Sequence, residues 1–256
     1  MTQHVDKKQS QGIQSIEIGY KILKKVAEAN RPIGITELAA LCEMSKSKLH
    51  RYLTSLCRVG LLKKGIDARY TLGTNLLLLG LQASEQLDIQ RIAEPVIQRL
   101  SEELNETVGL AIWGQNGPLF IRWQESSKTV NIGIRVGSYV SLTTSATGKS
   151  FSAYANDPEK EILINKELSA SGVEKTEFES EINEVRARGY ATTYGGFIPG
   201  IVAVAAPVFG QDETLVAALT IVGAAGGLDI NENSKAVRLI LKQAQALSKE
   251  LGFPGV

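Results

Sequence analysis

Apolar residues recur at helical spacing in three short stretches near the start of the chain. Residues 15–30 form the first stretch, and residues 37–42 form a shorter second one with Thr36 as its expected N-cap. Residues 45–60 form the third, which begins at a serine and ends at a glycine, as helices commonly do. The expected apolar face of the first helix consists of Ile16, Tyr20, Leu23 and Ala27, with Val26 beside it. Two helices joined by a short turn indicate a helix-turn-helix.

The third stretch separates its leucines from its charged residues. The leucines share one face, whereas Arg51 lies on the opposite face between Ser47 and Thr54. Lys46 and Lys48 add positive charge to the first turn, where a recognition helix meets base edges and phosphates. An ordinary surface helix can show the same pattern, so the neighbouring elements decide between the two interpretations.

A short hairpin is predicted directly after the third helix. Two apolar-basic runs flank the turn at residues 65–67, which is typical of a β-hairpin wing. Lys63, Lys64 and Arg69 would then be available to DNA phosphates. We therefore predict a winged helix-turn-helix DNA-binding domain over residues 15–73, preceded by a disordered arm over residues 1–14. The candidate DNA-binding residues are Thr36, Ser45, Lys46, Ser47, Lys48, His50, Arg51, Thr54, Lys64 and Arg69.

A leucine-rich segment at residues 74–88 follows the predicted wing. Its leucines spread too widely around a helix for one small domain to cover them. We interpret the segment as a linker helix that also packs against a second subunit. An ordinary buried core helix is the alternative.

Residues 89–256 mix helices and strands without a regular alternation, which predicts an α+β domain around an antiparallel sheet. Helices are expected at residues 88–105, where Pro95 should start a new turn or kink the helix, and at residues 178–188 and 234–251. Strands are expected at residues 107–114, 119–124, 130–136, 201–209 and 214–223.

Charge divides along the chain in the same way as the periodicity. Residues 1–80 hold 13 Lys and Arg against 6 Asp and Glu, whereas the remainder holds 15 against 21, for a total of +1. A basic module joined to an acidic one is typical of a nucleic-acid-binding domain followed by a domain that does not bind nucleic acid.

The residues that enzymes need are scarce. His4 falls in the predicted arm and His50 on the third helix, so no histidine base is available to the second domain. Cys42 and Cys57 fall in apolar helical patterns and predict neither a disulfide nor a metal site. The stretch ending in Gly-Lys-Ser at residues 148–150 lacks the first glycine of a phosphate-binding loop. We expect no enzyme, no cofactor and no metal, and, without a signal peptide or membrane span, a cytoplasmic protein.

Short motifs in a fixed order cover nearly the full chain, and together they resemble the IclR family of bacterial transcriptional regulators. The motifs occupy residues 14–16, 35–39, 50–53, 69–73, 146–149, 186–191, 200–201 and 205–208. The resemblance implies a GAF/PAS-like effector-binding domain, a homodimer or a homotetramer built as a dimer of dimers, and double-stranded operator DNA as partner. It also implies control of operator binding by a small metabolite. We expect a repressor rather than an activator.

The resemblance places an effector cavity between the loop before Gly-Lys, the segment after Gly-Tyr-Ala and the two late strands. Carried over to this chain, the effector-binding residues are Val140, Ala146, Thr147, Thr193, Ile201, Ala203, Thr220 and Val222. Family members that bind very small oxo-acids look more polar at these places, and Ser141 replaces a proline that is usual in the family. Because a buried charged ligand needs polar partners, we expect a neutral or singly charged effector with a substantial apolar or sugar-like surface. Arg135 would receive a carboxylate only if it pointed inward, and strand alternation favours the outward direction.

Two other functional classes fit parts of the pattern. One is a dimeric ligand-binding or interaction module whose winged helix contacts protein, and the other is an enzyme with a DNA-binding appendage. DNA binding that falls steeply with added salt separates a regulator from the first class. A turnover assay on any stabilising ligand separates it from the second.

Overall fold

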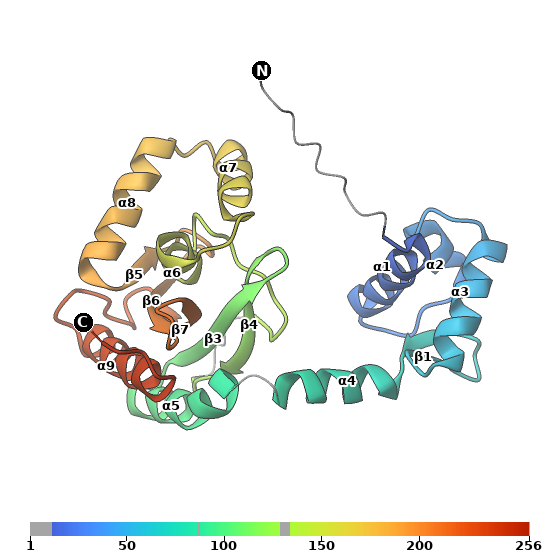
Figure 1. Cartoon of the computed structure of the whole chain (residues 1–256), viewed down its shortest axis with the longest axis horizontal. Helices are drawn as coiled ribbons and strands as arrows, with labels where there is room; N and C mark the ends of the chain where they lie inside the picture. The colour runs from blue at the N-terminus through green and yellow to red at the C-terminus, as the bar shows by residue number, and fades with distance from the viewer. Residues whose placement is uncertain (1–11, 86–87, 129–133, 256) are drawn as a thin grey trace, which may run out of the picture. The chain divides into compact units, whose positions relative to one another are not determined.

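The computed structural model describes residues 12–85, 88–128 and 134–255 (Figure 1). The chain divides into two compact units, Met1–Gln86 and Leu87–Val256, each with its own core. Within the described residues, none of the helices has both the length and the apolar character that a membrane crossing requires. Most of the predicted N-terminal arm lies outside the described residues.

The N-terminal unit is a winged helix-turn-helix followed by one further helix. Its elements are α1 (Gln14–Ala29), α2 (Ile35–Leu41), α3 (Lys46–Arg58), β1 (Leu62–Lys64), β2 (Tyr70–Leu72) and α4 (Thr74–Glu85). Side chains from the first three helices and the hairpin, among them Ile22, Leu38, Leu53 and Tyr70, fill one core. β1 and β2 pair antiparallel, as expected of a wing.

The ends of α3 lie where the sequence predicts them. The Ser45 hydroxyl accepts a hydrogen bond from the Lys48 backbone amide at 3.3 Å, and Gly60 follows the helix with φ +71°. At the same corner the Asn75 amide donates to the Val59 carbonyl at 2.9 Å. This hydrogen bond joins the start of α4 to the end of α3.

Two local predictions in this unit are wrong. Ile16 and Tyr20 are 67% and 61% exposed, while Gly19 and Ile22 turn inward instead. Two apolar stripes run side by side on α1, and the stripe that includes Gly19 meets the leucines of α3, because Gly19 lies against Leu56. Thr36 does not cap α2, because Gly34 is the N-cap residue and its carbonyl accepts from Leu38.

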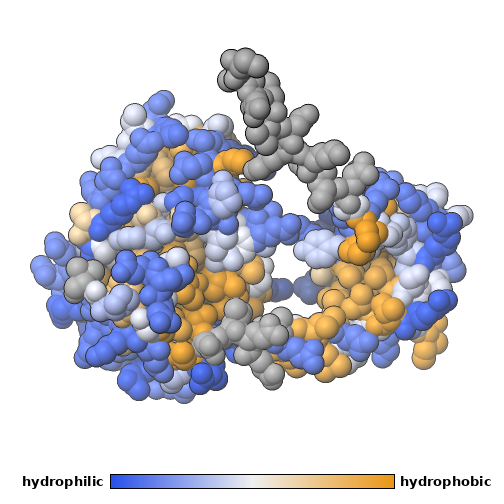
Figure 2. Space-filling model, in the orientation of Figure 1, coloured by the Kyte–Doolittle hydropathy of each residue, from blue (hydrophilic) through white to orange (hydrophobic). Residues whose placement is uncertain are grey.

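The leucines of α4 are open to solvent in the single chain. Leu77, Leu78, Leu79 and Leu81 are 52–61% exposed, and Figure 2 shows apolar surface along this helix. The alternative of an ordinary buried core helix is therefore wrong. An exposed apolar surface of this kind commonly marks an interaction site.

The C-terminal unit is a five-stranded antiparallel sheet between two helical layers (Figure 1). The strand order is β4-β3-β7-β6-β5, and α5 and α9 cover one face while α6 and α8 cover the other. The strands are β3 (Thr107–Gly114), β4 (Gly117–Gln124), β5 (Ala191–Tyr194), β6 (Ile201–Phe209) and β7 (Leu215–Ala224). The helices are α5 (Asp88–Leu104), α6 (Ala146–Tyr154), α7 (Lys160–Ser171), α8 (Lys175–Arg188) and α9 (Lys235–Glu250).

The predicted strands at residues 107–114 and 201–209 match β3 and β6, and α5 runs through Pro95 as one helix. The strand expected at residues 130–136 is not confirmed: residues 129–133 lie outside the described residues, and the three that follow form no strand. Helix α7 was not predicted, because only Ile164 and Leu168 of it are buried and its apolar pattern is weak.

Candidate DNA-binding and effector sites

All ten candidate DNA-binding residues lie on the surface of the N-terminal unit. Arg51 lies on the exposed face of α3, and in the part of the chain that the structure describes no carboxylate pairs with it. The Thr54 hydroxyl donates to the His50 carbonyl at 2.9 Å, so its proton is already used and only its acceptor capacity is free. The face that α3 presents is therefore basic and has guanidinium donors free to meet a polyanion.

The wing holds Lys64 and Arg69 differently. Lys64 lies over the Tyr70 ring, with Nζ 5.8 Å from the ring centroid. Arg69 lies 3.6 Å from the Asp67 carboxylate, so part of its charge is matched within the hairpin. Ile66 at the tip is fully exposed. Among the described residues, Lys64 therefore pairs with no carboxylate.

The eight predicted effector residues line one cavity in the C-terminal unit. The cavity is small, with about 30 Å³ of space for a water-sized sphere, so a metabolite must displace its walls. Sequence reasoning missed the other lining residues, which are Phe120, Ile134, Ser145, Phe197 and Ile198. Phe197 and Ile198 belong to the turn between β5 and β6, where no periodic pattern could have revealed them.

Charged side chains are absent from the described lining, and its polar groups are mostly satisfied. The Thr193 hydroxyl donates to the Thr144 carbonyl at 2.9 Å, and Ser145 donates to the Ser141 carbonyl at 2.6 Å. Thr147 and Thr220 form a hydroxyl–hydroxyl hydrogen bond of 2.9 Å from α6 to β7. Because only one of these two hydroxyls donates to the other, one proton in this pair is left for a ligand. Arg135 is exposed and does not line the cavity.

The loop over residues 141–144 is held by a carboxylate that the sequence did not suggest. Glu167 of α7 accepts hydrogen bonds from the backbone amides of Leu142 and Thr143 at 3.1 and 3.0 Å. It also accepts from the Ser141 hydroxyl at 2.6 Å. Gly148 lets α6 approach this loop, because a Cβ there would lie 1.9 Å from the Ser141 carbonyl oxygen. Glu167 thus fixes one wall of the cavity from an element outside it.

The Gly-Lys-Ser stretch is part of the core. Residues 148–150 lie inside α6 and are buried. The Lys149 ammonium pairs with Glu181 of α8 at 2.5 Å, and its side chain is only 11% exposed. The lysine and the carboxylate join two helices rather than holding a phosphate.

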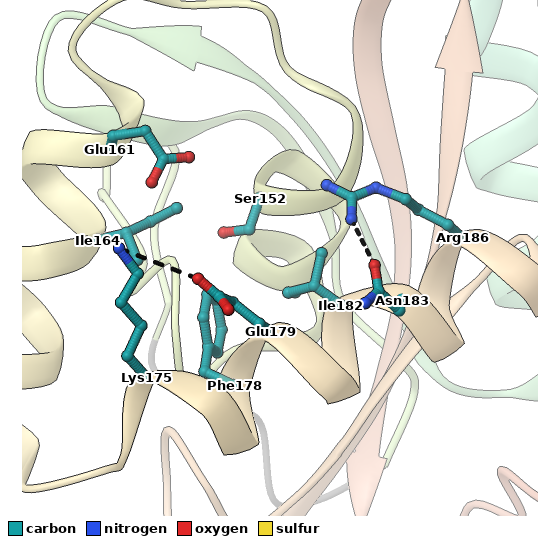
Figure 3. A pocket seen from close by; sticks show the side chains of 9 residues that line it. All are labelled: Ser152, Glu161, Ile164, Lys175, Phe178, Glu179, Ile182, Asn183 and Arg186. Atoms are coloured by element: carbon teal, nitrogen blue, oxygen red, sulfur yellow. Dashed lines mark hydrogen bonds and ion pairs between the residues drawn. The ribbon is translucent and has the colours of Figure 1, made fainter.

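A second cavity, of about 290 Å³, is lined by none of the predicted binding residues (Figure 3). Lys175 and Glu179 pair along α8 at 3.9 Å, and Arg186 donates to Asn183 at 2.8 Å. Arg186 also donates to the Ala153 carbonyl at the end of α6. The charged side chains that line this cavity are thus largely paired with one another or hydrogen-bonded to the backbone of the fold.

Reactive and metal-binding side chains do not gather in the described residues. His50 is exposed on α3, and burial raises the pKa of the Cys42 and Cys57 thiols, which keeps them protonated. Within the described ranges, groups of three or more histidine, cysteine or acidic side chains that could hold a metal ion do not occur.

Comparisons with known proteins cover both units. Residues 81–249 match the family model of the bacterial transcriptional regulator IclR C-terminal domain, and residues 15–65 match that of the IclR helix-turn-helix domain. The transcriptional repressor IclR of Escherichia coli is 23% identical over 248 residues, which cover 94% of this chain and 90% of that protein.

Two solved structures extend the comparison. Pseudomonas aeruginosa HmgR is 32% identical, with a TM-score of 0.61 over 95% of this chain and 100% of that one. An IclR homolog from Microbacterium hydrocarbonoxydans, complexed with 4-hydroxybenzoate, is 20% identical with a TM-score of 0.79 over 93% of this chain and 98% of that one. At 20% identity, the likeness to the Microbacterium protein shows a shared fold alone.

Proposed function

Because the chain belongs to the IclR family of bacterial transcriptional regulators, we propose that it is a repressor released from its operator by a small molecule. The chain is a transcriptional regulator with a helix-turn-helix DNA-binding domain and a C-terminal effector-binding domain. The exposed basic face of α3 is the observation that carries the operator contact. Its test is binding of duplex DNA at low salt, which should weaken by orders of magnitude as salt is raised because counterions are released on binding.

Within this proposal the ten candidate residues divide into two roles. Arg51 reads a base edge in the major groove from the centre of the α3 face. Ser47 beside it accepts or donates a single hydrogen bond, and Thr54 accepts one. The remaining residues contact phosphates and fix the register. They are Thr36, Ser45, Lys46, Lys48, His50, Lys64 and Arg69.

We assign residues 15–73 to DNA binding, residues 74–88 to a linker that joins two subunits, and residues 89–256 to effector binding. The exposed leucines of α4 support the linker role, because they would be covered by a second copy. A dimer, or a dimer of dimers, then sets the spacing of two half-sites. A protein that acts on chromosomal DNA works in the cytoplasm, which we propose as its location.

A fragment of residues 1–80 should fold alone but bind a full operator at least about 100-fold more weakly than the intact chain. The fragment keeps its own core, but it loses the tethering that makes the second half-site contact intramolecular. Fluorescence anisotropy on a labelled operator measures both affinities. Equal affinity for the fragment and the intact protein would refute the dimer argument.

The lining of the cavity favours a neutral or singly charged effector that is largely apolar and offers at least one hydrogen-bond acceptor. The described lining has no charged side chain to neutralise an anion, and it leaves one threonine proton free. 4-Hydroxybenzoate in the Microbacterium homolog is a ligand of this general kind.

The double variant Thr147→Val with Thr220→Val should weaken effector binding about tenfold. The double variant removes both hydroxyls of the hydrogen-bonded pair together, so neither is left buried without a partner. The unfolding free energy should therefore change little. Calorimetric titration of the effector and thermal unfolding of both proteins measure the two effects. Unchanged affinity would mean that the ligand does not use this pair.

The alternative of an enzyme with a DNA-binding appendage is not supported by any described cluster of catalytic side chains. We propose that the C-terminal domain binds its ligand without converting it. Recovery of the intact ligand after long incubation with the protein tests this, and a new product would show turnover.

A further inference from the structure

A larger open groove of about 650 Å³ lies elsewhere on the C-terminal unit and shares no residue with the effector cavity. It is bounded by the ends of α6 and α8, the second half of β6, α9 and the last described residues of the chain. Figure 1 shows α9 and the C-terminus beside this part of the sheet. Its volume falls within the range of about 300–1,000 Å³ that is typical of small-molecule sites.

Three aromatic rings form one wall of the groove. Tyr154 meets Phe209 edge to face with ring centroids 5.3 Å apart, and Phe209 stacks on Phe253 at the same distance. Leu241 and Ala244 of α9 add aliphatic surface. Such a wall buries apolar area without losing much side-chain freedom, since the rings already hold one another in place.

The charged groups that line the groove are all positive. Arg188 and Lys249 line it, and no aspartate or glutamate does. Half-buried Arg188 is held in place, because Nε donates to the Tyr190 carbonyl at 2.8 Å and one Nη to Thr192 at 3.1 Å. Within the described ranges, carboxylates pair with neither cation. A guanidinium and an ammonium that line one groove favour an anion, above all a carboxylate.

The edge of β6 in this groove cannot accept a peptide strand. β5 pairs with β6 only as far as Ala205, and two residues further along Pro207 has no N–H to donate. The Phe209 amide is already used, because it donates to the Ser248 hydroxyl at 2.9 Å. An occupant must therefore be bound by side chains, which favours a small molecule over an added strand.

We propose that this groove is a second ligand site, which binds an amphipathic carboxylate. The apolar body of the ligand lies against Phe209 and Phe253, and its carboxylate meets Arg188 and Lys249. The site is separate from the effector cavity, so the proposal goes beyond the regulator function described above.

The test is calorimetric titration of the full chain with 4-phenylbutyrate, and with 4-phenylbutanamide as its uncharged counterpart. Lys249→Gln and Phe253→Ala should each weaken binding of the acid about fivefold or more. The amide should bind wild type about as weakly as the acid binds these variants. Lys242→Gln removes an exposed lysine of the same helix that does not line the groove, and it should leave the affinity unchanged. Thermal unfolding checks that each variant is folded.

A variant blocked in the effector cavity, Ala203→Phe, should still bind the acid with wild-type affinity. Ala203→Val serves in its place if the larger residue prevents folding. The proposal is overturned if the acid fails to bind, if both groove variants bind it normally, or if the cavity variant alone abolishes binding. It is also overturned if Lys249→Gln changes the oligomeric state in sedimentation, because a second copy would then occupy the groove.

Discussion

Arg51→Ala should weaken operator binding by about 1–3 kcal/mol, because it removes a bidentate contact to a base edge. The exposed side chain has no carboxylate partner among the described residues, so its loss should leave the fold intact. Discrimination between the operator and random duplex should fall by a similar factor. Anisotropy titrations on both duplexes measure the affinity and the discrimination.

Two matched variants separate base reading from general charge. Lys64→Ala on the wing should weaken both duplexes alike and lower the salt slope by about one. Lys166→Ala removes an exposed positive charge from the C-terminal unit and should have no effect on either duplex. If Arg51→Ala is folded and binds the operator normally, α3 is not the reading helix.

Ala203→Phe should abolish release of the operator by the effector while leaving operator binding itself unchanged. Ala203 is nearly buried on β6 and lines a cavity that has no room for an aromatic ring. The ring should fill the cavity and overpack its walls at a cost of about 1–3 kcal/mol of folding stability, and the effector should then no longer fit. Operator release titrated with the effector on wild type and variant measures the effect.

Ala217→Val is the matched control, because Ala217 is buried on the neighbouring strand β7 and packs into the core beneath α5 and α9, and it lines neither the cavity nor the groove. It should reduce stability slightly and leave the effector response intact. A normal response in Ala203→Phe would place the effector site elsewhere. A strong wild-type response to glyoxylate-sized acids would refute the argument from cavity polarity.

The sequence predicts an element of this fold well where the caps and the apolar pattern of that element lie within its own residues. Helix α3 carries its cap at Ser45, its stop at Gly60 and one leucine face, so its bounds could be predicted closely. The face of α1 that turns inward could not be predicted from the sequence. The helix carries two apolar stripes, and only its contact with α3 decides which of them is buried. Helix α7 was missed because only two of its residues are buried.

At the effector cavity, the contacts that the sequence did not predict join residues far apart in the chain. Its eight expected lining residues came from a resemblance in motif order, and they do meet in one cavity. Glu167 is separated from the loop that it holds by more than twenty residues, and nothing in its neighbourhood indicates hydrogen bonds to Leu142 and Thr143. Long-range polar networks of this kind depend on tertiary structure and leave no periodic trace.

The most direct test of regulated DNA binding is one coupled titration. An operator is selected from a random duplex pool, and a stabilising ligand is found by thermal shift. Operator affinity is then measured by anisotropy at rising ligand concentration for wild type and Ala203→Phe. We predict that the ligand lowers operator affinity about five- to 150-fold in wild type and leaves it unchanged in the variant. A ligand that stabilises wild type but not Ala203→Phe, yet leaves the operator affinity of wild type unchanged, would contradict the claim that this cavity controls DNA binding.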